Sequence, residues 1–475
     1  MMIEGLMSRP STSKMERFRR SSNAVLCVSS LALFIDMLVY GVVVPILPTV
    51  VKDQLGGDSK AVGYLFACYA IGLLISTPIF AVLSDRYENR RYPMIIGMLG
   101  LCISTFCFGT AHTYWQLVFA RTMQGFSGGT SWTIGLGMLA DVFPPENLGV
   151  VMGTAMAINM LGLVTGPPLG GFMFQYWGYK APFALCAALA VVNLMAVVWM
   201  VEPIQLRNEL GLGPTTAASS PSESKRKLSD ASTLSTSASL SSDANESSRL
   251  VSPVDAPPEG PAPSYSPTMF TLLCDPVVFC VLCATIVASS IFCGIEPTLP
   301  IYLRQTFHAD ETTIGFLFIA MIVPTFLSPL VGYLADRCGR LLVSGIGALC
   351  FAVTLFFVPI PPDRSVYLSL IPLLLCGAAS CLMTTPLLPE IGSRVHAMGS
   401  GANGRVYGLY NMAYSLGMAI GPILAGFLID TYGFWWEMAV FALVLLAYSP
   451  LLLSWEVFPW IKSFLWPTPA YVELV

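Results

Sequence analysis

Long apolar runs separated by short polar loops dominate the chain. Each run is close to the roughly 20 residues that a helix needs to cross a bilayer. Six runs fall at 24–48, 61–83, 93–112, 115–139, 149–173 and 181–201, and six more at 276–301, 313–335, 341–360, 366–388, 405–429 and 434–455. The pattern predicts an all-α membrane protein with twelve transmembrane helices.

A polar segment at 202–268 separates the two sets of runs. It is rich in Ser, Pro and Ala and has few apolar residues, so it cannot bury a core and we expect it to be disordered. The predicted domains are an N-terminal segment at 1–22, a six-helix bundle at 23–201, the linker at 202–268, a second six-helix bundle at 269–458 and a tail at 459–475.

Composition excludes several other classes of protein. Of 475 residues, 55% are hydrophobic and 11% are charged, whereas about a quarter of a soluble domain is charged. The net charge of −4 offers no basic field for nucleic acid. Cys280 and Cys283 form a CxxC without a second pair or a nearby His, so we expect no metal site. We also expect no cofactor and no enzymatic activity.

Lys and Arg residues indicate the orientation in the membrane. They concentrate in the short segments on the same side as the N-terminus, and such segments usually face the cytosol. Both termini and the linker are therefore expected to be cytosolic.

The two sets of runs are copies of each other. Four landmarks recur in the same order at offsets of 251 to 255 residues. The matched pairs are Pro48 with Pro300, Pro78 with Pro329, Gly166-Pro167 with Gly421-Pro422, and Gly178 with Gly433. Such duplication predicts two pseudo-symmetric six-helix bundles.

Four motifs carry a resemblance to a known family. They are AVLSDRYENRR at 81–91, its copy GYLADRCGRL at 332–341, LVFARTMQGFSGG at 117–129 and GLVTGPPLGG at 162–171. With them the chain resembles the major facilitator superfamily (MFS), in its branch of twelve-span drug:proton antiporters. Within that branch, FIDMLVYGVVVPILP and GIEPTLPIY are most similar to vesicular amine transporters.

The resemblance implies a conformational latch in the loops after spans 2 and 8. An aspartate there can accept hydrogen bonds from the N-terminus of a helix in the opposite half, where positive dipole charge is concentrated. The latch residues are Asp85, Arg86, Asp336, Arg337 and Arg340. The first copy departs from the pattern because Glu88-Asn89 replaces the expected glycine.

Glycines and prolines in spans 5 and 11 predict close helix packing. The helix-packing residues are Gly162, Gly166, Pro167, Gly170, Gly417, Gly421 and Pro422. We expect span 5 to be bent and to pack tightly against span 8, which points to antiport.

Three charged residues, Asp36, Arg121 and Glu296, lie well inside predicted spans. A charge at the bilayer centre costs about 2.5–3.5 kcal/mol on insertion scales, so such groups usually face a cavity and act there. We expect Asp36 and Glu296 to couple proton movement to transport, and Arg121, which keeps its proton, to be their counter-charge. Together they predict one polar pocket where the two halves meet.

Further polar and aromatic residues are candidates for substrate binding. These are Tyr40, Gln124, Asn159, Thr384, Asn411 and Tyr414. For each of them, a backbone hydrogen bond or helix packing is at least as good an explanation. Glu390 and Asp430 fall at span ends and are expected to meet water.

The charge pattern differs from that of the amine carriers. The resemblance implies a lysine in span 2 and acids in spans 10 and 11, where this chain has Tyr69, Thr384 and Asn411. A biogenic amine is therefore not the expected substrate.

The predicted function is a proton-coupled antiporter that exports a small amphipathic metabolite or drug, cationic or neutral, from the cytosol by alternating access. The expected partners are this solute, protons and the lipid bilayer, with the proton gradient as driving force. We expect a monomer in the plasma membrane. Alternatives are vacuolar or vesicular loading of an amine-like or organic-acid solute, a proton-coupled uptake symporter, and a receptor or scaffold that acts through its linker.

Overall fold

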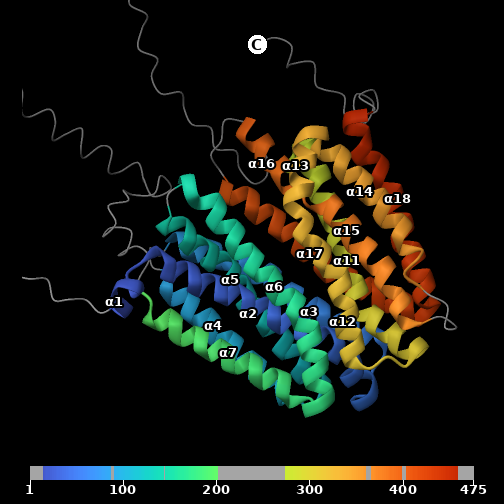
Figure 1. Ribbon diagram of the computed structural model, residues 1–475, viewed down its shortest axis with the longest axis horizontal. Coiled ribbons are helices and arrows are strands. Elements are labelled where there is room, and N and C mark those ends of the chain that lie inside the picture. The colour runs from blue at the N-terminus through green and yellow to red at the C-terminus, as the bar shows by residue number, and fades with distance from the viewer. Residues whose placement is uncertain are drawn as a thin grey trace, which may run out of the picture.

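A computed structural model describes residues 14–86, 90–143, 145–201, 273–359, 365–397 and 403–457. The predicted linker at 202–268 and tail at 459–475 lie outside these residues, as do the first 13 residues of the N-terminal segment. The described chain folds into helices, as the apolar runs predict, and the two halves are arranged side by side (Figure 1).

The N-terminal half holds the first set of helices. They are α1 (Lys14–Arg19), α2 (Ser22–Thr49) with the π-helical η1 (Val50–Gln54), α3 (Ser59–Arg86), α4 (Arg91–Gly109), α5 (Tyr114–Val142), α6 (Pro145–Trp177) and α7 (Lys180–Trp199). Six of these, α2 to α7, correspond to the six predicted spans.

The C-terminal half repeats this order with two interruptions. Its elements are α11 (Pro276–Phe307), α12 (Glu311–Ile322), η2 (Val323–Leu327), α13 (Ser328–Cys338), α14 (Arg340–Leu355), η3 (Val366–Ser369), α15 (Leu370–Thr384), α16 (Leu387–Ala397), α17 (Asn403–Tyr432) and α18 (Phe434–Val457). Spans 8 and 10 are each divided, at η2 with Pro324 and between α15 and α16 at Pro386, because proline lacks the N–H that would continue the helix.

Ten of the twelve predicted spans are helical segments long and apolar enough to cross a membrane. The other two are α5, whose inner turns carry Arg121, Gln124 and several small residues, and α14, which is apolar but has 16 residues. The described residues confirm the all-α class, and each of the twelve predicted spans is helical there, ten of them with the length and hydropathy of a membrane span.

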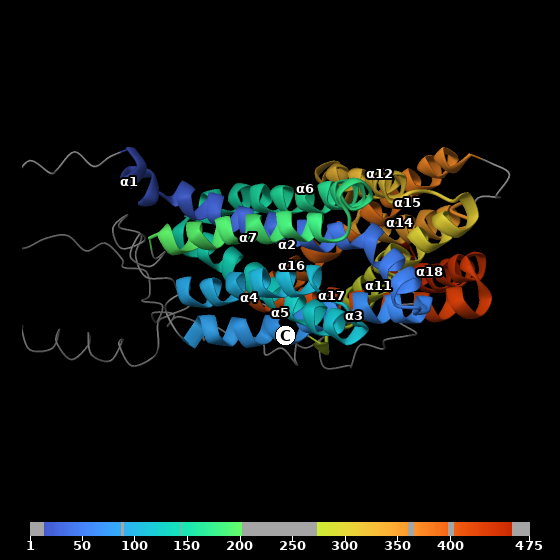
Figure 2. The same cartoon turned by 90° about the horizontal axis from the view of Figure 1, so that it is seen from below.

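Helix pairing repeats between the halves. In the N-terminal half α2 packs against α6 and α4 against α7, and the equivalent helices of the other half, α11 with α17 and α14 with α18, pack in the same way. Between the halves, α6 packs against α12 along one edge and α3 against α17 along the other (Figure 2). The two contacts are equivalent, because α6 corresponds to α17 and α12 corresponds to α3, as two-fold pseudo-symmetry requires.

Gly162, Gly166 and Gly170 of span 5 pack against α2 of the same half. A Cβ on Gly162 would lie 2.3 Å from the Phe34 carbonyl oxygen, and one on Gly170 would lie 2.5 Å from that of Val42, so this glycine face meets α2 of the same half. Residues four apart share one helix face, and this face of α6 is turned toward α2 rather than toward span 8. Span 5 does pack against span 8, as expected, since α6 packs on α12, but it does so through Pro167 and Gly171 and not through this glycine face.

The two prolines are among the closest contacts between the halves. The carbonyl oxygen of Pro167 on α6 lies 2.4 Å from where a Cβ on Gly315 of α12 would stand. The equivalent Pro422 on α17 approaches Gly63 of α3, with a corresponding distance of 2.1 Å. Each contact needs a glycine, because any side chain would collide with the backbone opposite.

The two ends of the molecule differ. The halves converge where α2 leads into α3 and α11 into α12, and their ribbons splay apart toward α13 and α16 (Figure 1). We call the first the closed end and the second, which holds the loops after spans 2 and 8, the signature end.

Candidate functional site

The three charges inside the spans come together where the halves meet. Asp36 lies on α2, Arg121 on α5 and Glu296 on α11, and all three side chains are buried, with 0, 0 and 4% of their surface exposed. Two tyrosines, Tyr40 and Tyr69, complete the cluster, with ring centroids 5.0 Å apart.

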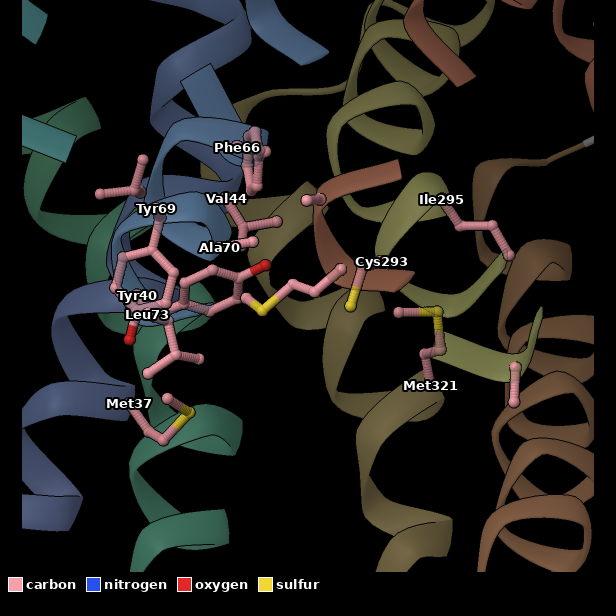
Figure 3. Packing of buried hydrophobic residues seen from close by; sticks show 14 of the residues in the cluster. Met37, Tyr40, Val44, Phe66, Tyr69, Ala70, Leu73, Cys293, Ile295 and Met321 are labelled. Carbon is pink, nitrogen blue, oxygen red and sulfur yellow. The ribbon is translucent and has the colours of Figure 1, made fainter. Parts of the chain in front are cut away.

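Glu296 is held from the opposite half. The Tyr40 hydroxyl donates a short hydrogen bond to Glu296 Oε2, so α2 and α11 are joined directly at the centre of the molecule. Figure 3 shows Tyr40 and Tyr69 next to each other on the N-terminal half, with Cys293 of α11 opposite them. Tyr40 is therefore the one predicted substrate-binding residue that contacts a deep carboxyl.

Asp36 is held within its own half. The Tyr69 hydroxyl of α3 lies 3.3 and 3.2 Å from its two carboxylate oxygens and donates to them. Gly128 of α5 leaves room for this contact, since a Cβ there would lie 2.7 Å from Asp36 Oδ1. Tyr69 was not among the predicted site residues. It could have been found from the sequence, because it stands where the resemblance to amine carriers implies a lysine.

Arg121 is surrounded by aromatic rings. Its guanidinium carbon lies 5.3 to 5.9 Å from the ring centroids of Tyr40, Phe66, Tyr69 and Phe108. Nη1 donates to Gln124 Oε1 at 3.3 Å, while Nε and Nη2 have no hydrogen-bond partner within the described part of the chain. The guanidinium thus remains a donor available to a solute or to a reoriented carboxylate.

The remaining predicted binding residues make other contacts. Asn159 donates to the Leu33 carbonyl at 3.1 Å, and Thr384 donates to the Ser380 carbonyl at 2.9 Å, so both bond to backbone. Gln124, besides accepting from Arg121, lies 3.5 Å from Thr105 Oγ1.

Two of the six face the opposite half or the central cluster. Asn411 Nδ2 of α17 lies 3.4 Å from Thr77 Oγ1 of α3, across the interface. Tyr414 lies beside Cys293 of α11. These two residues extend the polar cluster along α17.

At the signature end the second loop makes its contacts within its own half. Asp336 accepts from Arg340 at 2.9 Å, and Arg340 Nη1 also donates to the Pro389 carbonyl at 3.1 Å. Arg337 lies over the Tyr333 ring at 4.6 Å. In this conformation Asp336 is therefore bound to its own loop rather than to a helix of the opposite half, and the side chains of Asp85 and Arg86 lie outside the described residues.

Asp430 forms the contact that the sequence assigned to the loop aspartates, but at the closed end. Its two carboxylate oxygens accept from the backbone N–H groups of Ser59 and Lys60, at 3.2 and 2.9 Å, at the start of α3 in the opposite half. The equivalent position of the first half, Gln175, bonds Thr312 of α12 at 2.5 Å. Asp430 is exposed, as expected for a residue at the end of a span, and it also binds the start of α3 in the other half.

Charged groups add to this closure. Arg304 of α11 pairs with Asp53 of η1 at 2.5 Å, and Thr49 of α2 donates to Glu311 of α12 at 3.1 Å. We call these contacts, with those of Asp430 and Gln175, the closed-end clasp. Glu390, also expected to meet water, is partly exposed and lies 3.4 Å from Arg394 and 3.8 Å from Arg340.

Another buried acid, Glu437 on α18, was also missed. It lies in the first turn of the last span and is completely buried. The apolar run begins only three residues earlier, so the sequence placed Glu437 at the membrane edge, where a charge is ordinary.

Comparison with known proteins identifies the family. The family model of the Major Facilitator Superfamily matches residues 29–404 and 277–464. The chain belongs to this superfamily, and it is a multi-pass membrane transporter.

Several relatives are vesicular transporters by name. The chain is 28% identical to the chromaffin granule amine transporter of Homo sapiens, over 82% of this chain and 64% of that protein. It is 25% identical to a probable vesicular acetylcholine transporter-B of Danio rerio, over 92% and 80% of the two chains. An uncharacterised MFS-type transporter of Schizosaccharomyces pombe is 26% identical over 90% of this chain and 94% of its own length.

Solved structures support the fold. The nucleoside transporter NupG superposes with a TM-score of 0.65 at 10% identity, covering 90% of this chain and 98% of that one. The human organic anion transporter MFSD10 gives a TM-score of 0.59 at 17% identity, covering 91% and 99%.

Proposed function

We propose that the protein is a proton-coupled antiporter that exports a small amphipathic solute, cationic or neutral, from the cytosol. The observation that carries this proposal is the central cluster, in which two buried carboxyl groups and one arginine lie between the halves of a transporter fold. Buried ionisable groups in membrane proteins usually mark ion or substrate pathways. The signature end, which holds most of the basic loop residues, is assigned to the cytosol.

The charge of the cluster changes with proton binding. With both carboxyls ionised, Asp36, Glu296 and Arg121 sum to one negative charge, which favours a cation. With both protonated they sum to one positive charge, which disfavours it. Proton and cationic solute therefore compete for one site, and such competition is the basis of exchange.

Glu296 also connects the cluster to the conformational change. Its bond to Tyr40 joins the two halves, so its strength contributes to the free-energy difference between the inward-open and outward-open states. Hydrogen bonds to a charged acceptor are about twice as strong as neutral ones. Protonation of Glu296 from the outer side would weaken this link and change the populations of the two states.

Loading of a vesicle or vacuole is the second candidate. The names of the amine-transporter relatives favour it, and lumen and exterior are equivalent in this mechanism. The lost span-2 lysine, replaced by Tyr69, argues against the same solute. We propose the plasma membrane and a monomer; a fluorescent fusion protein distinguishes the two membranes.

The substitution Glu296→Gln tests the proposal. Metabolite profiling of cells that lack or overproduce the protein first identifies the solute as a compound that changes in opposite directions in cell and medium. In proteoliposomes, we expect Glu296→Gln to abolish solute movement driven by an imposed pH gradient and to retain solute–solute exchange. Glu390→Gln, which removes a carboxylate outside the cluster, is the matched control. pH-driven movement that persists in Glu296→Gln would remove Glu296 from the mechanism.

A further inference from the structure

Glu437 is a buried carboxyl with a single partner. Its Oε1 lies 2.7 Å from the Thr298 hydroxyl of α11, and its Oε2 has no hydrogen-bond partner among the described residues. Phe441, one turn further along α18, packs where a Cβ on Gly294 would stand, 2.9 Å from its ring. The first two turns of α18 are therefore seated directly on the part of α11 that carries Glu296.

Among the described residues, no cation pairs with this carboxyl. Helix α18 packs against α11, α14 and α17. Ionisable groups on these helices have other partners: Tyr302 stacks on Phe434, Asp430 bonds the start of α3, and Arg340 pairs with Asp336. Within the described part of the chain, Thr298 is the one hydrogen-bond partner of the Glu437 carboxyl group.

The Thr298 hydroxyl has one proton and three acceptors. Besides Glu437, it lies 3.1 Å from the Gly294 carbonyl and 3.4 Å from the Ile295 carbonyl. When Glu437 is a neutral acid, its own O–H donates to Thr298, and the Thr298 proton stays on the α11 backbone. When Glu437 is ionised, the Thr298 proton must turn to the carboxylate and leave the Gly294 carbonyl.

The α11 backbone is already short of hydrogen bonds at this place. Pro297 and Pro300 lack an N–H, so the carbonyls one turn before each of them, at Cys293 and Glu296, lose their helical donors. Thr298 and Glu296 are two residues apart, which places them on opposite faces of the helix. One face is bonded to Glu437 and the other to Tyr40 of the opposite half.

We propose that Glu437 is a second proton-binding site of the C-terminal half, and that its proton sets the Thr298 hydroxyl and thereby the position of Glu296. This inference rests on the proposed proton coupling. The step is proton binding alone: the carboxylate takes up a proton, and the Thr298 O–H rotates from the carboxylate to the Gly294 carbonyl. Glu437 is thus a positioning residue for Glu296.

Difference infrared spectroscopy of the reconstituted protein, titrated with pH, tests this without a substrate. The C=O stretch of a protonated carboxylic acid reports each buried acid separately. We expect the wild type to show a titrating band that is missing in Glu437→Gln. We also expect the wild type to take up one proton more than this variant over the titration. A second band, missing in Glu296→Gln, assigns Glu296.

Substitutions of Thr298 test the coupling. Thr298→Val should change both the frequency of the Glu437 band and the pH at which the Glu296 band titrates, whereas Thr298→Ser, which keeps the hydroxyl, should match the wild type. Thr285→Val is the matched control, because Thr285 is buried on the same helix and bonds only the Val281 carbonyl, at 2.8 Å.

Two results would overturn the inference. One is an identical set of titrating bands in the wild type and Glu437→Gln. The other is a Glu296 titration that Thr298→Val and Thr285→Val leave equally unchanged. A wild type whose transport ignores the pH gradient would instead contradict the proposed function, while the infrared titration would still measure Glu437.

Discussion

At the scale of single residues, tyrosines separate the charges of the central site. Asp36 and Glu296 each bind a tyrosine hydroxyl, and Arg121 faces the rings of the same tyrosines. A direct buried ion pair would be hard to separate, because breaking one costs about 3–5 kcal/mol. Hydroxyl and ring contacts hold the charges in place with smaller individual free energies, which suits a site that must rearrange in every transport cycle.

Arg121→Lys is expected to be a severe substitution although it keeps the charge. A lysine ammonium cannot present a planar face to four rings, and cation–π contacts contribute about 2 kcal/mol or more when desolvated. We expect unfolding at lower temperature, by about that free energy, and loss of transport. Fluorescence-monitored thermal unfolding of purified protein measures the first effect.

Arg337→Lys provides the control. Arg337 is exposed and faces a single ring, that of Tyr333. Its substitution should change the free energy of unfolding by no more than about 0.5 kcal/mol. Equal losses in the two variants would mean that the aromatic surroundings of Arg121 contribute nothing particular.

The sequence predicted the acids of the site better than their partners. Asp36, Arg121 and Glu296 stand out because charges are rare inside apolar runs. Tyr69 does not stand out, since tyrosine is ordinary in a span, and only folding places its hydroxyl beside Asp36. Glu437 was missed because its burial depends on how α18 is seated on α11, which no local pattern specifies.

At the scale of helices, the sequence predicted the elements but not all of their neighbours. Apolar length identified all twelve spans, and glycine spacing identified faces that pack closely. The same spacing is compatible with any partner helix, so it could not show that Gly162 and Gly170 meet α2. Gly63 and Gly315, which make two of the close contacts between the halves, belong to no motif and were not predicted.

Gly63→Ala and Gly315→Ala should therefore disturb the interface between the halves. The added methyl group would lie 2.1 or 2.4 Å from a proline carbonyl oxygen, and overpacking of this kind costs about 1–3 kcal/mol. We expect lower unfolding temperatures in both variants and more frequent opening of the closed end.

Gly153→Ala is the matched control on α6, because a Cβ there meets nothing within 4 Å. It gains the helix propensity of alanine, about 1 kcal/mol, without a collision. If all three alanine variants were stabilised alike, the glycines at the interface would not be required for close approach.

At the scale of the whole molecule, the closed-end clasp contributes to the balance between the two open states. Asp430→Ala removes both bonds to the start of α3, and loss of a helix cap costs about 1 kcal/mol. This shifts the ratio of states by about fivefold toward opening at the closed end.

Cys293 is a native reporter of that opening, since it is buried beside the central site. Its labelling by a membrane-impermeant thiol reagent, followed by mass spectrometry, should be faster in Asp430→Ala when the reagent is added from the closed end. Asp275→Ala is the control, because Asp275 caps α11 with two similar bonds inside one half, at 3.0 and 2.9 Å. Faster labelling in both variants, or in neither, would contradict a specific role of Asp430.

The two flanks of the clasp occupy equivalent positions in the repeat but differ in charge. Asp430 binds α3 through an ionised carboxylate, whereas Gln175 binds α12 through a neutral amide. Dissolved salt screens exposed charges and has little effect on neutral contacts. Rising ionic strength on that face of the membrane would weaken the contact between α17 and α3 before the contact between α6 and α12. The two halves of the duplicated chain therefore close the molecule through one salt-sensitive contact and one that salt hardly affects.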